Sequence, residues 1–146
     1  TRAPVGDRAP APAAPLTFSR MAADASRDVP AVSPAEADHR RQREPNLLII
    51  DVQDAADVAR AGTIPGAVNI SYGTLTFAAD HELPEAWRSP LLADHNRPII
   101  TTCAMGPLGA ISGKLLRDMG FSDVSYLDGG VQGWREAGLA LQPFPN

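Results

Sequence analysis

The sequence predicts an α/β fold in which an open, parallel central sheet carries helices on both faces. Short apolar runs at 47–52, 98–103 and 124–127 are typical of strands that are buried on both sides. Helical patterns follow these runs along the chain, and strands that alternate with helices favour a parallel sheet. The 146 residues suffice for one domain with a buried core and a terminal arm.

We divide the chain into three segments by composition. Residues 1–15 are rich in proline and alanine, which favours extended conformations with little to bury, so we expect a solvated arm. Residues 16–29 predict a helical extension, with Thr17 as its N-cap. Residues 30–146 are expected to form the folded domain.

Capping patterns predict the first helices of this domain. The sequence 33–36 reads Ser-Pro-Ala-Glu, which places an N-cap serine, a first-turn proline and a glutamate in the order of a capping box. That helix should run to about residue 43. After the first long strand, Asp54 is positioned to cap a helix that ends near Gly62.

The remaining elements follow from short apolar runs and from glycines. A turn precedes a second short strand, and the variable stretch from 71 to 97 is expected to contain one helix. Two further helices end where Gly120 and Gly138 stand at the C′ position. The expected ranges are strand 67–70 and helices at about 85–93, 108–119 and 131–137.

Charge and composition exclude several classes of function. A formal net charge of −4 argues against general nucleic-acid binding. No apolar run approaches the roughly 20 residues that cross a bilayer. A single cysteine allows no internal disulfide and no cysteine-rich zinc site, and the three histidines lack ligand spacing. We therefore expect no metal and no cofactor.

Cys103 is the candidate nucleophile because it ends an apolar strand and precedes a loop and a helix. Ligands of open parallel sheets bind beyond the carboxyl ends of the strands. Loop amides and a helix N-terminus can converge on an anion there, and their field favours a thiolate, the nucleophilic form. The alternative is an inert, buried cysteine. Its place before a glycine-bearing loop favours the functional interpretation.

Four motifs, in order across about 110 residues, resemble the rhodanese family of sulfurtransferases. Ile50-Asp51-Val52-Gln53 resembles its I-D-V-R, and 62–67 (Gly-Thr-Ile-Pro-Gly-Ala) resembles its G-H-I-P-G-A. Residues 103–108 match the position and length of its six-residue active loop, C-x-x-G-x-R. The segment from Gly120 to Trp134 resembles its closing part. Residues 16–28 also resemble the N-terminal extension of some bacterial members.

The resemblance implies that Cys103 is catalytic. Its sulfur would attack a sulfane sulfur, and the resulting persulfide would pass its outer sulfur to a thiol or to cyanide. The residues implied to bind the substrate are those of the loop and the first position after it: Ala104, Met105, Gly106, Pro107, Leu108 and Gly109.

Two aspartates are candidates for supporting roles. Asp51 could orient the active loop, or it could be a buried carboxylate that nearby backbone amides satisfy, and we favour the second interpretation. Asp128, followed by two glycines, is expected to make a turn and a helix cap beside the site rather than to perform chemistry.

Departures from the family pattern bear on the sulfur donor. Leu108 stands where the loop arginine is expected, and Gln53 replaces a second arginine. Losing a charge-assisted hydrogen bond to an oxyanion costs about 1.5–3 kcal/mol, and Pro107 offers no amide hydrogen. We expect weak turnover of thiosulfate and a preference for polysulfide, glutathione persulfide or protein persulfides. Lys114 or Arg60 could replace the missing charge.

Two other functions remain to be weighed. One is a sulfur carrier or protein-interaction module that does not turn over. The other, a relative of phosphatases or arsenate reductases, is disfavoured because those need a longer loop that ends in arginine, whereas position 109 is glycine. The expected partners are a small sulfane-sulfur donor and a thiol or protein acceptor, without nucleic acid or membrane. The expected compartment is the cytoplasm, or the periplasm if a signal peptide has been removed.

Overall fold

A five-stranded parallel sheet forms the centre of the structure, a computed structural model that describes Gly6 and residues 8–143. The predicted open, parallel sheet is confirmed. Its order is β1-β5-β4-β2-β3, so β4 lies between β2 and β5 and is buried along its whole length. The strands are β1 (Ala31–Val32), β2 (Leu48–Asp51), β3 (Val68–Asn69), β4 (Ile99–Thr102) and β5 (Val124–Leu127).

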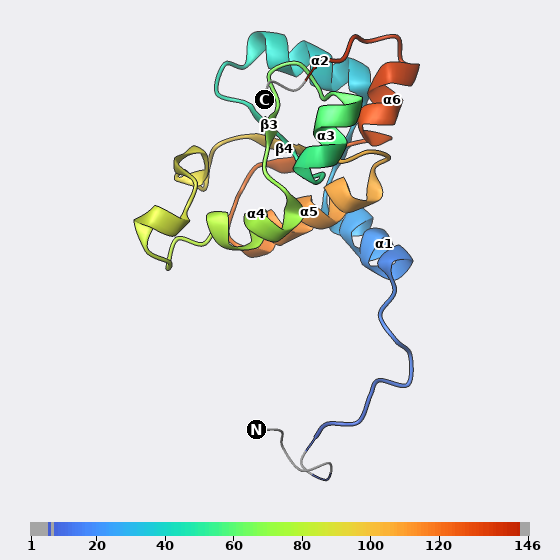
Figure 1. Cartoon of the computed structure of the whole chain (residues 1–146), viewed down its shortest axis with the longest axis vertical. Helices are drawn as coiled ribbons and strands as arrows, with labels where there is room; N and C mark the ends of the chain where they lie inside the picture. The colour runs from blue at the N-terminus through green and yellow to red at the C-terminus, as the bar shows by residue number, and fades with distance from the viewer. Residues whose placement is uncertain (1–5, 7, 144–146) are drawn as a thin grey trace.

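Helices cover both faces of the sheet, as predicted (Figure 1). One apolar cluster joins α4 and α5 to the sheet, and a smaller one joins α1 to α5. A third cluster packs α2 and α6 against the other face, with Trp134 fully buried in it. The helices are α1 (Phe18–Asp28), α2 (Pro34–Arg43), α3 (Ala55–Ala61), α4 (Tyr72–Ala78), α5 (Pro107–Asp118) and α6 (Gly130–Glu136).

The predicted helix caps agree with the structure at two of three positions. The Thr17 side chain accepts a hydrogen bond from the backbone amide of Arg20, and Ser33 accepts one from the amide of Glu36, at 3.1 Å each. Asp54 occupies the N-cap of α3, but its side chain makes no capping hydrogen bond. Its carboxylate therefore remains available to neighbouring space.

The predicted helix at 85–93 is wrong. Two short 3₁₀ turns, η2 (Glu85–Trp87) and η3 (Pro90–Leu92), stand there instead. The reason is Pro90, whose ring removes an amide donor and disfavours helical backbone at the residue before it. The same middle region contains α4, which we did not predict, and the two-residue β1 was also missed because so short a run gives no periodicity.

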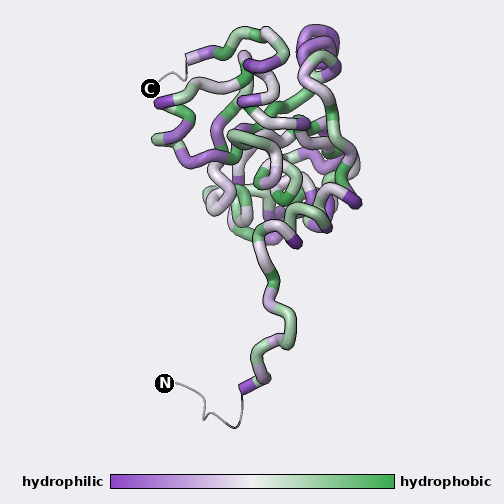
Figure 2. Tube along the Cα trace, turned by 90° about the vertical axis from the view of Figure 1, so that its right-hand side faces the viewer, coloured by the Kyte–Doolittle hydropathy of each residue, from purple (hydrophilic) through white to green (hydrophobic). Residues whose placement is uncertain are grey.

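The N-terminal arm stands away from the folded domain. Residues 8–15 are exposed, and the described part of the arm extends from α1 in both views (Figures 1 and 2). The expected arm also includes residues 1–5 and 7, which lie outside the described residues. Over the described part of the chain, no helix combines the length and the apolar character needed to span a membrane.

Candidate active site

Cys103 follows the last residue of β4, and its side chain is buried, with 5% exposed. The backbone amide of Gly106 donates a hydrogen bond to its sulfur, with N and Sγ 3.1 Å apart. Gly106 adopts a φ of +122°, a conformation that residues with a Cβ rarely adopt. This glycine turns the loop so that an amide faces the sulfur.

The first turn of α6 holds the loop from behind. The amides of Val131 and Gln132 donate to the carbonyl oxygens of Cys103 and Ala104, at 2.8 and 2.9 Å. Gly130 makes this approach possible, because a Cβ there would lie 2.5 Å from the Cys103 oxygen. The loop carbonyls are thus bound to α6, while the Gly106 amide faces Sγ.

The N-terminus of α5 lies directly after the loop. Gly106 is its N-cap and Pro107 its first residue. Gly109 is buried against β4, where a Cβ would stand 3.2 Å from the Cα of Thr102, and the Thr101 hydroxyl donates to the Gly109 carbonyl at 2.6 Å. The positive end of the α5 dipole is therefore fixed close to Cys103.

A cavity of about 360 Å³ lies beside Cys103. It combines loop residues with side chains from the segment after β2 and from α3, α4 and α1, and its charged lining is acidic. No lysine or arginine is among the described side chains that line it. The lining residues are Phe18, Val52, Gln53, Asp54, Asp57, Tyr72, Cys103, Ala104, Met105, Pro107 and Leu108.

The structure brings most of the predicted loop residues together at this cavity. Ala104, Met105, Pro107 and Leu108 line it beside Cys103. The other two predicted binding residues are placed differently: Gly106 contacts the sulfur through its amide, and Gly109 lies beneath the loop. We did not predict Phe18, Tyr72 or Asp57, which reach the cavity from distant elements and carried no sequence signal for it.

The two cations considered as replacements for the loop arginine do not line this cavity. Lys114 pairs with Asp28, Nζ to Oδ2, at 3.1 Å, and Arg60 is bound to the carboxylate of Asp57. Leu108 itself is half-buried and packs against the apolar core. An oxyanion at Cys103 would therefore depend on backbone amides.

Asp51 is fully buried and lies outside the cavity lining. Its Oδ2 accepts from the Thr63 hydroxyl at 2.7 Å, and Gln53 donates its backbone amide and its side-chain nitrogen at 3.1 Å. Burial raises the pKa of Asp51, while these hydrogen bonds from Thr63 and Gln53 act in the opposite direction. Asp51 is thus a buried carboxylate satisfied by neighbours, although two of its donors are side-chain groups rather than backbone amides.

Asp128 borders the loop at a place outside the Cys103 cavity. It follows β5, and its backbone amide donates to the Val32 carbonyl at 2.8 Å, just before the turn at Gly129 that leads into α6. With Met105, Gly106 and Pro107 it borders a separate hollow of about 280 Å³. It does not line the cavity at Cys103.

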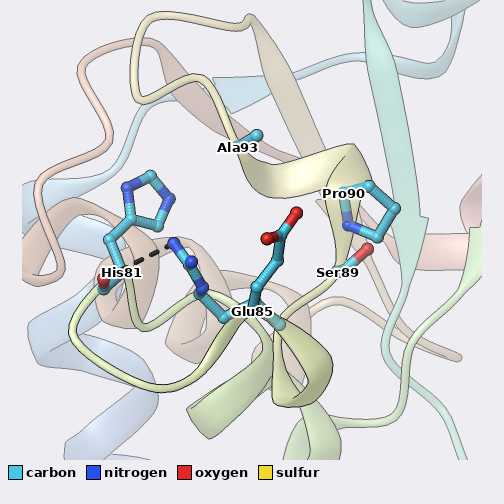
Figure 3. A pocket seen from close by; sticks show the side chains of 6 residues that line it. His81, Glu85, Ser89, Pro90 and Ala93 are labelled. Atoms are coloured by element: carbon cyan, nitrogen blue, oxygen red, sulfur yellow. Dashed lines mark hydrogen bonds between the residues drawn. The ribbon is translucent and has the colours of Figure 1, made fainter.

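A further cavity, of about 320 Å³, lies in the 3₁₀ region (Figure 3). The Glu85 carboxylate points into it, and a guanidinium nitrogen of Arg88 donates to the His81 carbonyl at 3.4 Å. It contains no thiol and shares no lining residue with the cavity at Cys103. The Cys103 cavity is therefore the candidate active site.

Comparisons with known proteins place these observations in a family context. The family model of the rhodanese-like domain matches residues 33–137. A thiosulfate sulfurtransferase GlpE from Stutzerimonas stutzeri is 31% identical over 102 residues, which cover 70% of this chain and 82% of that protein.

Two solved structures share the fold. One, a protein of unknown function and possible tyrosine phosphatase from Rhodopseudomonas palustris, has a TM-score of 0.81 at 24% identity and covers 92% of this chain and all of its own. The other, a polysulfide-sulfur transferase homodimer from Wolinella succinogenes, has a TM-score of 0.66 at 27% identity, with 86% of each chain covered.

Proposed function

The chain belongs to the rhodanese-like domain family, and from this premise we propose that it is a sulfurtransferase in which Cys103 carries sulfane sulfur to a thiol or to cyanide. The observation that supports this most directly is the Gly106 amide, 3.1 Å from Sγ, beside a cavity of about 360 Å³. A backbone N–H aimed at the sulfur stabilises a thiolate or a persulfide anion without a side-chain base.

The proposed cycle has two displacements. The Cys103 thiolate attacks the sulfane sulfur of the donor, the donor's bond to that sulfur breaks, and the leaving group keeps the electron pair. Cys103 then holds a persulfide. An acceptor thiolate attacks the outer sulfur, and the persulfide S–S bond breaks with its electrons returning to Sγ. The acceptor leaves as a persulfide, so no external oxidant or reductant is consumed.

The cavity supports the donor preference inferred from the missing arginine. Thiosulfate carries an oxyanion group, and at this cavity that group would meet Asp54 and Asp57 rather than a lining cation. We therefore propose polysulfide, glutathione persulfide or protein persulfides as donors. The similarity to the Wolinella polysulfide-sulfur transferase supports a donor without an S–O group.

The second candidate is a sulfur carrier or interaction module that exchanges sulfur only with a protein. It is favoured by the burial of Cys103 in a cavity that two exposed apolar side chains also line, Met105 at 65% and Phe18 at 54% exposure. Such a rim suits contact with a protein surface as well as with a small molecule.

We do not propose a phosphatase, despite the shared fold with the Rhodopseudomonas protein. Phosphate-monoester chemistry needs cationic or multiple amide contacts to the transferring group. Here Leu108 and Gly109 stand where an arginine would be needed, and Pro107 lacks an amide hydrogen.

A single-turnover experiment with mass spectrometry tests the proposal. Purified protein is exposed separately to polysulfide, thiosulfate and mercaptopyruvate, and the mass is read before and after a chase with cyanide or a small thiol. We expect Cys103 to gain one sulfur from polysulfide and to lose it in the chase. C103S is the matched control, because a hydroxyl replaces the thiol at the same position and should gain no sulfur.

The outcomes separate the candidates. Loading followed by discharge to small acceptors supports the enzyme. Loading that only a protein acceptor can discharge supports the carrier. If none of the donors adds sulfur to Cys103, the sulfurtransferase proposal is wrong.

A further inference from the structure

Three residues with hydrogen-bond acceptors, from the β2–α3 connection and the first turn of α3, line the Cys103 cavity. They are Gln53, Asp54 and Asp57, and they share this lining with the residues of the active loop. Asp54 is exposed and lies at the N-cap of α3, and Asp57 is half-buried in the first turn of the same helix. The mouth of the cavity is therefore rich in negative charge and acceptor oxygen.

Asp51 fixes which end of the Gln53 amide is free. Gln53 donates its side-chain nitrogen to both carboxylate oxygens of Asp51, at 3.1 Å each. An ionised carboxylate only accepts hydrogen bonds, so the nitrogen must face Asp51. The amide oxygen is left as the hydrogen-bonding atom that Gln53 can offer a substrate.

Nearby positive charge offsets this acidity only in part. The Arg60 side chain binds Asp57, but it is 73% exposed and lies outside the cavity lining. The α3 N-terminus carries a partial positive charge, which the full charges of Asp54 and Asp57 exceed. Among the described side chains, Asp54 has no ion-pair partner within 4 Å.

Apolar groups complete the cavity and strengthen the effect of these charges. The Phe18 ring comes from α1, which precedes the residues that the family model matches. Met105 and Leu108 border the same space. Charges beside apolar walls interact more strongly than charges surrounded by water, so substrate charge should influence reaction at Cys103.

We propose that this site selects its sulfur substrates by charge, and that it prefers thiols and persulfides bearing an ammonium or guanidinium group close to the sulfur. The positive group would lie among Gln53, Asp54 and Asp57 while the sulfur reaches Sγ. The inference rests on the proposed function for the nature of the substrate, but charge selection itself can be tested without turnover.

The direct test uses two methanethiosulfonate reagents of similar size and opposite charge, one with an aminoethyl and one with a sulfonatoethyl group. In each case the Cys103 thiolate attacks the sulfenyl sulfur, the S–SO₂ bond breaks and methanesulfinate leaves with the electron pair. Cys103 is the sole cysteine of the chain, so the rate of thiol loss reports this site alone. Each rate is divided by the rate of the same reagent with free 2-mercaptoethanol.

We expect the normalised rate of the cationic reagent to exceed that of the anionic reagent by about tenfold at low salt, because the Asp54 carboxylate attracts one reagent and repels the other, while Arg60 offsets Asp57 in part. The ratio should shrink as salt is raised. The double variant D54N/D57N should bring it close to one. The matched control E36Q/E136Q removes the same number of charges from exposed positions outside the cavity lining, and it should keep the preference.

A second experiment asks whether the preferred positive group belongs to a small thiol or to a protein. It offers different acceptor thiols to the protein after Cys103 has been converted to the persulfide. One arm compares cysteamine with 3-mercaptopropionate, each corrected for its thiolate concentration. The other compares two cysteine peptides flanked by arginine or by glutamate. A preference confined to the first arm identifies small aminothiols, and one confined to the second identifies a protein acceptor with basic neighbours.

A normalised reagent ratio of one or less would overturn the inference, and so would a preference that survives D54N/D57N. Failure of Cys103 to take up sulfur would instead overturn the proposed function, while the reagent ratio would still decide charge selection. The two proposals can therefore fail independently.

Discussion

Replacing Gly130 with alanine should detach the Cys103 loop from α6. Alanine at the φ of +62° costs about 1–2 kcal/mol, and its Cβ would lie 2.5 Å from the Cys103 carbonyl oxygen. The backbone conformation fixes the position of the Cβ, and the oxygen belongs to the backbone, so no rotamer change relieves the clash. The hydrogen bonds from Val131 and Gln132 to the loop carbonyls would stretch or break, at about 0.5–1.5 kcal/mol each. We expect a total loss of about 2–5 kcal/mol, a large part of the stability of a small domain.

Urea unfolding and the alkylation rate of Cys103 measure this effect. G138A is the matched control, because Gly138 follows the other end of α6 with a φ of +82° and has nothing within 4 Å of a built Cβ. It should lose only the backbone-strain part, about 1–2 kcal/mol, and leave the alkylation rate unchanged. The reasoning is refuted if G130A is no less stable than G138A, or if both variants alkylate at the wild-type rate.

Three further predictions concern the cavity and the buried carboxylate. L108R should raise kcat/KM for thiosulfate about tenfold or more by adding a charge-assisted hydrogen bond, and an unchanged thiosulfate rate beside a normal polysulfide rate would contradict it. F18A should raise KM several-fold with a small effect on the urea midpoint, because the ring is 54% exposed and lines the cavity; a lowered midpoint with unchanged KM would show that the ring only stabilises the fold. For Asp51, burial raises the pKa above its ordinary value of 3.8, so the folded protein holds this proton more tightly than the unfolded chain. We therefore expect the free energy of unfolding of the wild type, relative to that of D51N, to fall as pH rises from about 4 through the folded pKa. Urea titrations measure this difference. A rise over the same pH range would show that the carboxylate charge stabilises the fold.

The strands and the loop were predictable because their signals are local. Strands buried on both faces leave continuous apolar runs, and β2 and β4 lie inside the ranges predicted for them. The position of Cys103 followed from the same logic, since a strand end and a helix start bracket a short loop. The misplaced helix at 85–93 shows the limit, because Pro90 divides this stretch and its two parts form short 3₁₀ turns.

The cavity lining was far less predictable. Phe18 lies 85 positions before Cys103, and the sequence predicted only that its segment is helical. It reaches the cavity because Ala25 of α1 packs against Ala110 and Ile111 of α5. Asp57 likewise carried no sequence signal for this cavity. Such convergence depends on packing between elements that no local pattern encodes.

Local patterns were enough to predict the parallel sheet, the family resemblance, the cysteine at a strand end and the absence of the loop arginine. These follow from residue identity, periodicity and capping, which act over a few positions. The packing of the elements had to be known before it was clear that neither Lys114 nor Arg60 lines the cavity, that α6 binds the loop carbonyls, and that Asp54 and Asp57 border the space beside Cys103. The physical reason is that charge acts through distance in space, and distances between remote residues are set by how the elements pack.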